Sequence, residues 1–288
     1  MYTPQLIALF SAIFYASVAV SARLGLQYST PLTATCVALS VRTVTLWAAV
    51  FLTGGIPRVA FIAVLLFVIL GVVQTATSLL TYIGISKIGA SRSQPLRNTY
   101  PLWSAMIAIT VLGEEAGFAV LVGTLFVVVG IVLISWQPEE KASVYRWWHV
   151  VFPLGGAFLA GIAFPVRRYA LTISNEPLLF SALLAVVSLT CLVMVLLSPV
   201  GTQRPVWNRK ALLPFIVAGG FESLAAFLSL VAVSVGRVVV VSPIVATSPF
   251  WTLLMTVVFL RGLERINART VIGTFCVVAG TIAIIVWG

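Results

Sequence analysis

Long apolar runs separated by short polar links fill almost the whole chain. A membrane-spanning helix needs about 20 mostly apolar residues, and ten runs fit that length. Their approximate bounds are 5–22, 32–53, 60–83, 93–112, 117–136, 149–166, 177–199, 211–233, 238–260 and 270–287. The pattern predicts an all-α membrane protein in which ten helices cross the bilayer.

The longest polar link divides these runs into two sets of five. It extends from Gln137 to Tyr145 and contains Glu139, Glu140 and Lys141. We therefore expect a first five-helix repeat at 1–136, a linker at 137–148 and a second five-helix repeat at 149–288.

The two halves repeat one pattern of residues. Four residues of the first half recur 148 positions later: Pro95 as Pro243, Thr99 as Thr247, Pro101 as Pro249 and Trp103 as Trp251. Because each repeat holds an odd number of helices, the second copy must enter the membrane inverted. Such inverted repeats place a central cavity near the bilayer midplane, where the halves meet.

Composition supports a membrane location and excludes other classes. Apolar residues make up 61% of the chain and charged residues 8%, whereas soluble proteins carry about 25% charged residues. The net charge is +10, but the basic residues are scattered singly, without a nucleic-acid-binding pattern. Cys36, Cys191 and Cys276 each lie within an apolar run and are interpreted as small buried side chains. The expected partners are the lipid bilayer and a small-molecule substrate, with no nucleic acid, and the chain could act as a monomer.

The loop charges predict an orientation. Eleven Lys and Arg residues follow the odd-numbered predicted helices, whereas four lie on the other side: Arg58, Arg167, Arg168 and Arg237. Because Lys and Arg accumulate in cytoplasmic loops, both termini are expected outside the cytoplasm.

Glu222 is the clearest ionisable residue within an apolar run, and Gln74 is its counterpart in the other repeat. Ionisable residues at membrane depth are functional candidates, so we expect the two side chains to face each other across a central cavity. Two other interpretations stay open. The pair could supply a hydrogen bond between helices, or Glu222 could cycle a proton.

Arg42 and Arg97 also lie within predicted helices. Arg97 could hold a substrate carboxylate, because the guanidinium fork matches that group, or it could extend to the lipid headgroups. Arg42 could pair with Glu222 as a structural ion pair.

Prolines interrupt the fourth and ninth runs. Irregular backbone at membrane depth is tolerated where it lines protein or a water-filled cavity, and aromatic and hydroxyl groups accompany these prolines. The predicted hinges are Pro95, Pro101, Pro165, Pro243 and Pro249. The predicted substrate-binding residues are Gln74, Tyr82, Asn98, Tyr100, Trp103, Phe164, Glu222, Ser223, Ser248 and Trp251. An alternative is that the Trp residues only pack between helices.

The remaining sequence features are glycines suited to helix packing and an absence of enzyme motifs. Four glycines, Gly123, Gly130, Gly273 and Gly280, permit close helix approach, either within the fold or at a dimer face. The sequence contains no catalytic triad motif, HExxH or P-loop. We therefore expect no enzymatic activity, no metal and no cofactor.

With these features the chain resembles the drug/metabolite transporter superfamily, of the EamA type. The resemblance covers the whole chain and rests on the two five-helix repeats and the proline-rich fourth and ninth runs. It also rests on short motifs: Gly113-Glu114-Glu115, Arg261-Gly262-Leu263-Glu264, Gly123-Thr124 and Gly273-Thr274. The resemblance implies a basket of helices around a central cavity that exports amino acids or other small metabolites. The aromatic amino acid exporters are the preferred branch.

The resulting prediction is a secondary transporter that exports small metabolites across the bacterial inner membrane by alternating access. Aromatic or neutral amino acids are the first candidates. The third, fourth and sixth predicted helices would rock against the eighth, ninth and first. Two alternatives remain, a proton-coupled exporter of drugs or quaternary amines and a membrane scaffold without transport.

Overall fold

The computed structural model describes residues 3–88, 90–135, 147–197, 205–259 and 268–287. Within these ranges the chain is helical and contains no strand. Most of the predicted linker lies outside the described residues, as does the Arg261–Glu264 motif.

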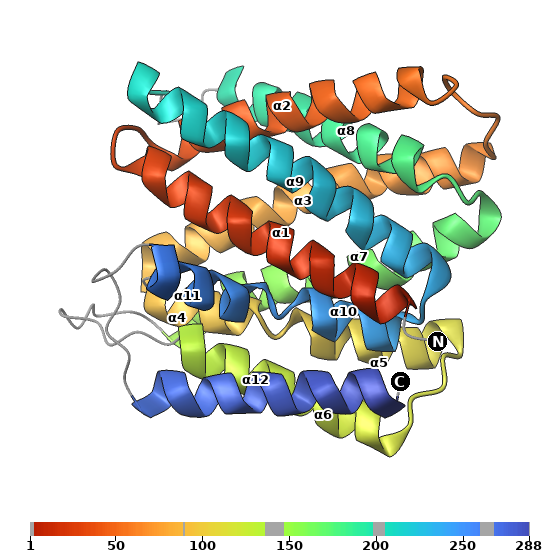
Figure 1. Ribbon diagram of the computed structural model, residues 1–288. Helices are drawn as coiled ribbons and strands as arrows, with labels where there is room; N and C mark the ends of the chain where they lie inside the picture. The colour runs from red at the N-terminus through yellow and green to blue at the C-terminus, as the bar shows by residue number, and fades with distance from the viewer. Residues whose placement is uncertain (1–2, 89, 136–146, 198–204, 260–267, 288) are drawn as a thin grey trace.

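Eight long helices form most of the bundle (Figure 1). They are α1 (Thr3–Leu26), α2 (Pro31–Leu52), α3 (Phe61–Ile88), α6 (Phe118–Ser135), α7 (Val151–Ile173), α8 (Pro177–Leu197), α9 (Arg209–Val235) and α12 (Ala268–Trp287). A short 3₁₀ turn, η1 (Trp147–Val150), precedes α7. Nine stretches of the described chain are long and apolar enough to cross a membrane.

The fourth and ninth predicted helices are each broken into two. The fourth comprises α4 (Ala90–Arg97) and α5 (Tyr100–Leu112), and the ninth comprises α10 (Val238–Val245) and α11 (Ser248–Phe259). Proline cannot donate to the carbonyl four residues before it and clashes with that group. Pro101 and Pro249 stand four residues after the last residues of α4 and α10, so the two prolines explain both breaks.

A threonine stabilises each break in the same way. The Thr99 hydroxyl donates to the Leu96 carbonyl at 2.7 Å, and the Thr247 hydroxyl donates to the Ile244 carbonyl at 2.7 Å. The repeated Thr-x-Pro pattern therefore ends one helix and starts the next within the membrane-spanning region of each repeat.

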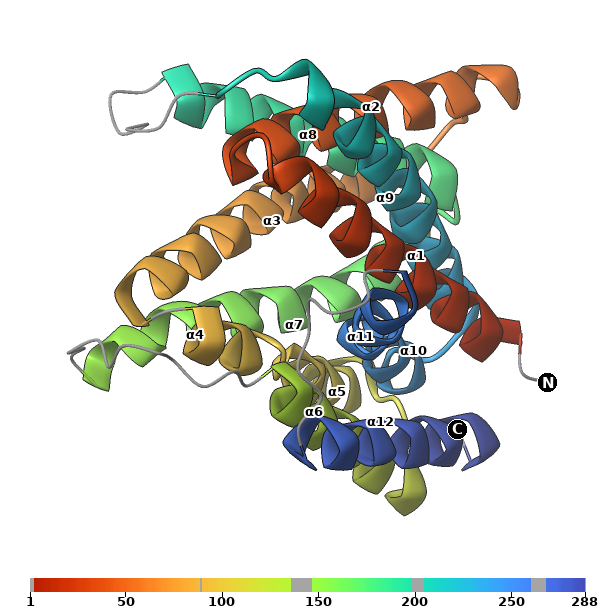
Figure 2. The same cartoon turned by 60° about the vertical axis from the view of Figure 1, so that its left-hand side comes forward.

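The helix contacts are reciprocal between the two repeats. Helix α1 packs against α9, and their counterparts α7 and α3 also pack together. Helix α2 contacts its own counterpart α8, and α6 contacts its counterpart α12, at opposite edges of the bundle (Figure 2). This exchange of partners is what a two-fold relation between the repeats requires.

Glycines bring α6 and α12 into close antiparallel contact. A Cβ added to Gly123 would lie 2.9 Å from the Gly280 carbonyl oxygen, and one added to Gly130 would lie 2.6 Å from that of Gly273. The glycines thus form a tight helix pair within the fold. Because the pair is antiparallel, the closing helices of the two repeats run in opposite directions, as inverted repeats must.

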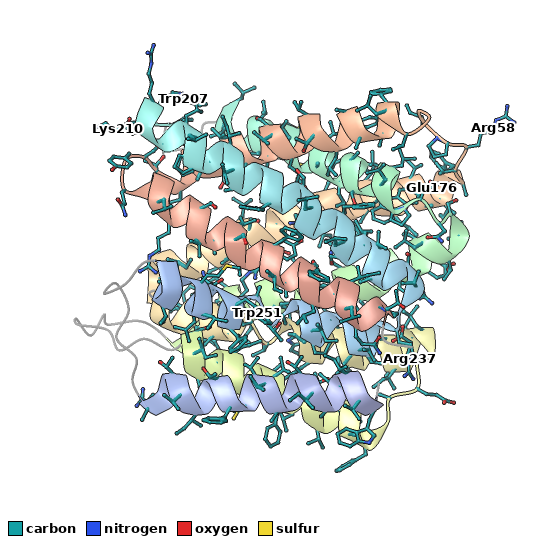
Figure 3. All side chains as sticks on the ribbon, viewed as in Figure 1. Arg58, Glu176, Trp207, Lys210, Arg237 and Trp251 are labelled. Carbon is teal, nitrogen blue, oxygen red and sulfur yellow. The ribbon has the colours of Figure 1, made fainter. Side chains whose placement is uncertain are left out.

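Both ends of the described chain lie at the same end of the bundle (Figure 1). Arg58, Glu176 and Arg237 are at that end, whereas Trp207 and Lys210 are at the other (Figure 3). The assignment of one end to the cytoplasm stays a prediction.

The predicted end of the sixth run at 166 was wrong, because α7 continues past Pro165 to Ile173. Arg167 and Arg168 are therefore helical rather than part of a loop. Arg168 donates to the Val233 and Ser234 carbonyls at 3.0 and 2.5 Å, and Arg167 contacts residues of the bundle interior. Both arginines face protein, which is why the helix tolerates them.

Candidate functional site

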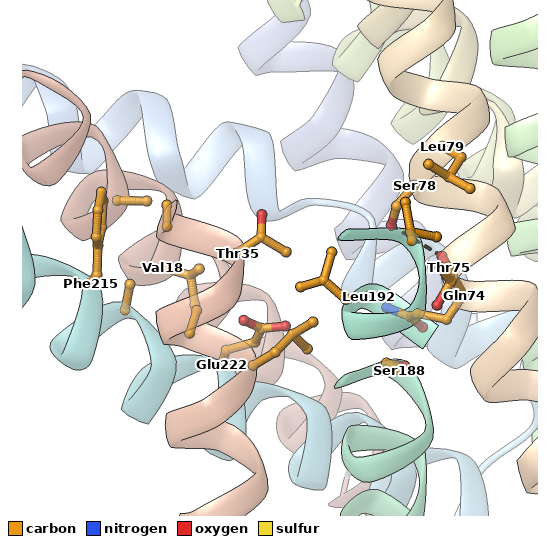
Figure 4. A pocket seen from close by; sticks show the side chains of 16 residues that line it. Val18, Thr35, Gln74, Thr75, Ser78, Leu79, Ser188, Leu192, Phe215 and Glu222 are labelled. Carbon is orange, nitrogen blue, oxygen red and sulfur yellow. Dashed lines mark hydrogen bonds between the residues drawn. The ribbon is translucent and has the colours of Figure 1, made fainter. Parts of the chain in front are cut away.

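A cavity of about 290 Å³ lies among α1, α2, α3, α8 and α9. Glu222 on α9 and Gln74 on α3 enter it from different helices (Figure 4). The remaining lining is mostly apolar and includes Leu192. The cavity extends from the middle of α3 and α9 toward the helix ends opposite the termini, since Ala22 and Val195 also line it.

A second cavity, of about 220 Å³, lies between α3, α7 and the two broken helices. A smaller space of about 40 Å³ shares Tyr15 and Arg167 with the second cavity and Glu222 with the first. Gln74 lines all three, so they form one chamber system around the middle of α3. The breaks in the helices line the second cavity with Arg97, Asn98, Tyr100, Val245, Ala246 and Ser248.

Glu222 is held by an ion pair across the chamber. The Arg42 Nη1 atom donates to Glu222 Oε1 at 3.2 Å, and the two side chains are 5% and 21% exposed. The pair links α2 of the first repeat to α9 of the second. The structural pairing considered for Arg42 is therefore present, and Glu222 retains a face toward the larger cavity.

Arg167 is a cation of the second cavity that the sequence pattern assigned to a loop. Its Nη2 atom donates to Gln74 Oε1 at 3.3 Å, and its guanidinium lies 5.4 Å from the centre of the Phe164 ring. A Gln amide and an aromatic face are neutral partners. Arg167 thus brings a positive charge into the middle of the bundle.

Aromatic rings form one wall of the second cavity. The rings of Tyr100 and Phe164 stack with centroids 5.8 Å apart and an interplanar angle of 12°. Tyr15 adds a third ring to the lining, from α1. Such a wall suits a flat or apolar part of a ligand.

Polar groups of the first broken helix are fixed by neighbouring helices. The Arg97 Nε atom donates to the Thr81 hydroxyl at 3.1 Å, and the Asn98 amide donates to the Ser135 hydroxyl at 3.2 Å. Both Arg97 and Asn98 also line the second cavity. The break therefore presents positioned polar groups rather than loose ones.

Five of the ten predicted binding residues line the second cavity, namely Gln74, Asn98, Tyr100, Phe164 and Ser248. Glu222 lines the other two spaces. The role of each in binding stays a prediction, but the structure brings these six together.

The other four predicted binding residues are placed differently. The Trp103 ring packs edge-on against Phe158 of α7, with centroids 5.3 Å apart. The Trp251 ring lies edge-on to that of its neighbour Phe250 within α11 and therefore gives no evidence of packing between helices. The Ser223 hydroxyl lies 2.7 Å from that of Thr45 on α2. The Trp103 and Ser223 contacts fit packing between helices. The Tyr82 side chain lies outside the described residues.

The predicted hinges occupy two kinds of position. Pro95, Pro165 and Pro243 lie inside α4, α7 and α10, whereas Pro101 stands at the start of α5. Pro249 is the second residue of α11. All five therefore lie in helices that line the second cavity, three inside a helix and two in its first turn.

A hydrogen-bonded contact joins the two repeats at the end of the bundle that holds the termini. Glu114, from the link between α5 and α6, accepts from the backbone N–H groups of Val238 and Val239 at 2.9 and 3.0 Å. Arg237 donates to the Glu115 carbonyl at 3.0 Å. The first repeat thus supplies a carboxylate cap for the N-terminus of α10, which has no side-chain cap of its own.

The fold and its chamber define a class of protein: a multispanning helical bundle of two repeats around a polar and aromatic interior. A sequence model of the EamA-like transporter family matches residues 3–136 and, separately, residues 147–286. The chain belongs to the EamA-like transporter family, a family of transporters of small solutes. The prediction of the family is confirmed, and the two matches support the two-repeat architecture.

Solved structures share this fold. One crystal structure, described simply as that of a protein, is similar with a TM-score of 0.79 over 98% of this chain and 96% of its own. The two sequences are 15% identical, so the likeness concerns the fold alone. A comparison with curated proteins gives no match.

Proposed function

We propose that this protein is a secondary transporter that exports small carboxylate-bearing metabolites across a bacterial inner membrane. The proposal rests on the chamber between the repeats, which is lined by the broken helices, the Arg167 guanidinium and the stacked Tyr100 and Phe164 rings. Midplane sites of this construction bind substrate in inverted-repeat transporters. Amino acids with aromatic or neutral side chains are the first candidates.

The charges around the chamber favour these solutes over organic cations. Glu222, the acid that an organic cation would use, already pairs with Arg42. Arg167 lines the second cavity and would repel a positive solute. The geometry therefore supports carboxylate binding better than quaternary-amine export.

Alternating access would proceed by rocking of α3, α4, α5 and α7 against α9, α10, α11 and α1. The five prolines would absorb the bending. In the described conformation the chamber extends away from the termini, and the Glu114 cap joins the repeats at the end that holds them. With the termini outside the cytoplasm, as the loop charges predict, this conformation would receive solute from the cytoplasm.

Counterflow in proteoliposomes tests the proposal. Purified protein is reconstituted in vesicles preloaded with unlabelled Phe, Met or Thr, and uptake of the labelled amino acid is measured with and without a pH gradient. Saturable counterflow without a gradient would support a carrier of these solutes. Gradient-driven movement of an organic cation alone would favour the multidrug alternative. Flux equal to empty vesicles for every solute, including the amino-free acid 3-phenylpropanoate, would support a scaffold.

A further inference from the structure

We propose that the bound solute carries a net negative charge and that Arg167 holds its carboxylate. This assignment rests on the proposed transport function but replaces its first candidates, the amino acids, with a narrower substrate class: an organic acid anion with a flat or apolar body. A free amino group is not required for recognition and weakens binding.

The charges of the chamber are unbalanced among the described residues. Arg42 is neutralised by Glu222 at 3.2 Å. Arg167 contacts the neutral Gln74 amide and the Phe164 ring, and no described carboxylate forms an ion pair with it. A cation at membrane depth is costly unless it is paired. A single anionic group on the solute would supply the missing charge.

Two hydrogen-bond donors in the wall of the second cavity have no partner among the described residues. Within the described part of the chain, the Arg167 Nε atom and the Thr77 hydroxyl are buried without a hydrogen-bond partner, and both residues line this cavity. Buried polar groups without partners are uncommon and point to a ligand or water. A carboxylate has two acceptor oxygens, so it can accept from a guanidinium edge and from a hydroxyl at once.

The surfaces beside Arg167 suit the rest of such a solute. The stacked rings of Tyr100 and Phe164 form a flat wall, and Val245 and Ala246 add apolar surface from the α10–α11 break. An aromatic or branched aliphatic body fits these surfaces. The cavity volume of about 220 Å³ limits that body to a small molecule.

The same surroundings disfavour a zwitterion. Glu222 is the acidic residue among the described linings of the three connected spaces, and Arg42 already binds it. An ammonium group beside the carboxylate would therefore lie near Arg167 without an acidic partner of its own. The corresponding acid without the amino group avoids that repulsion.

Binding of a ligand series tests the charge of the solute separately from transport. Binding to the purified protein in nanodiscs is measured by intrinsic tryptophan fluorescence and by thermal shift. The ligands share one phenyl body: 3-phenylpropanoate is an anion, phenylalanine a zwitterion, phenethylamine a cation and 3-phenylpropan-1-ol neutral. Phenyl phosphate adds a group with nearly two negative charges.

We expect 3-phenylpropanoate to bind at least about 10-fold more tightly than the other four ligands, as one charge-assisted hydrogen bond permits. Equal or tighter binding of phenylalanine or the alcohol would overturn the assignment of a net negative charge. Tighter binding of phenyl phosphate would overturn the assignment of a carboxylate. No binding by any of the five would overturn the whole proposal.

Variants at Arg167 identify the anchor. Arg167→Gln should weaken 3-phenylpropanoate binding by about 10- to 100-fold, whereas Arg58→Gln, at an exposed loop position, should leave it unchanged. Arg167→Lys keeps the positive charge but loses the two-pronged guanidinium, so a smaller loss of 3-phenylpropanoate affinity is expected. If the Gln variant does not fold, the Lys variant tests the role of Arg167 in its place. Unchanged affinity in either Arg167 variant would refute the role of Arg167, whereas binding of 3-phenylpropanoate without counterflow of that same anion would refute only the transport function.

Discussion

The contribution of the Glu114 carboxylate to the contact between the repeats can be tested quantitatively. It accepts from two backbone N–H groups at the start of α10, on Val238 and Val239, both of which are 0% exposed. Hydrogen bonds to a charged acceptor contribute about 1.5–3 kcal/mol each, and an anion at a helix N-terminus gains further from the helix dipole. Water cannot easily replace the carboxylate at buried groups.

We therefore expect Glu114→Ala to lower the free energy of opening this contact by about 2–4 kcal/mol, allowing for non-additivity of the two bonds. That corresponds to about a 30- to 700-fold larger open population. Glu114→Gln keeps one acceptor but loses the charge, so about half the effect is expected.

Hydrogen–deuterium exchange in nanodiscs measures this opening directly, in peptides that cover α10. Exchange of the Val238–Val241 amides should accelerate by the stated factor in Glu114→Ala. Glu115→Ala is the matched control, because among the described residues Glu115 contributes its backbone carbonyl to this contact, and its side chain is exposed. Equal exchange in the two variants would refute the capping role of Glu114.

Three further substitutions follow from the packing. Gly130→Ala should destabilise the bundle by about 1–3 kcal/mol through overpacking, since a Cβ there would lie 2.6 Å from a carbonyl oxygen of α12. Gly117→Ala is the control, because its Cβ would meet nothing within 4 Å. Thermal unfolding in detergent compares the stability of the two variants. Glu222→Gln should cost about 2–3 kcal/mol by leaving the Arg42 charge unpaired, and joint replacement of both residues by Leu and Met should recover most of that loss in the same assay. Pro249→Ala should let α10 and α11 join and slow solute counterflow by about 10-fold while raising the melting temperature; faster flux would contradict the hinge.

Most of the scaffold could be predicted because it depends on periodic and repeated features. Apolar run length located the spanning segments, and the recurrence of Thr99 and Pro101 as Thr247 and Pro249 marked the two points where helices break. Because Gln74 and Glu222 occupy equivalent positions in the two repeats, they were predicted to face one cavity, and both line the larger one. These inferences need only local chemistry and the internal symmetry of the chain.

The missed features depend on contacts distant in sequence. Arg167 follows a proline closely and precedes a second arginine, a pattern that resembles a helix end, yet Gln74 and Phe164 accommodate it inside. The internal repeat gave no signal either, because the residue 148 positions before Arg167 is Ala19, which is neither basic nor polar. Tyr15 lies in an apolar run, where nothing local distinguishes a cavity residue from a packing residue. Only the packing of the helices reveals the positions of Arg167 and Tyr15.

The reciprocal packing of the repeats has a consequence for the second state of the transport cycle. The α1–α9 contact is more extensive than the equivalent α7–α3 contact, so the two halves share a pattern but hold different conformations. Exchanging those conformations would produce a molecule open at the opposite end without any new fold. The energy difference between the two states would then come only from positions where the halves differ in sequence. The cap is one such position, since the residue 148 positions after Glu114 is Gly262, which has no carboxylate. The strength of the Glu114 cap would then bias the resting orientation of the carrier.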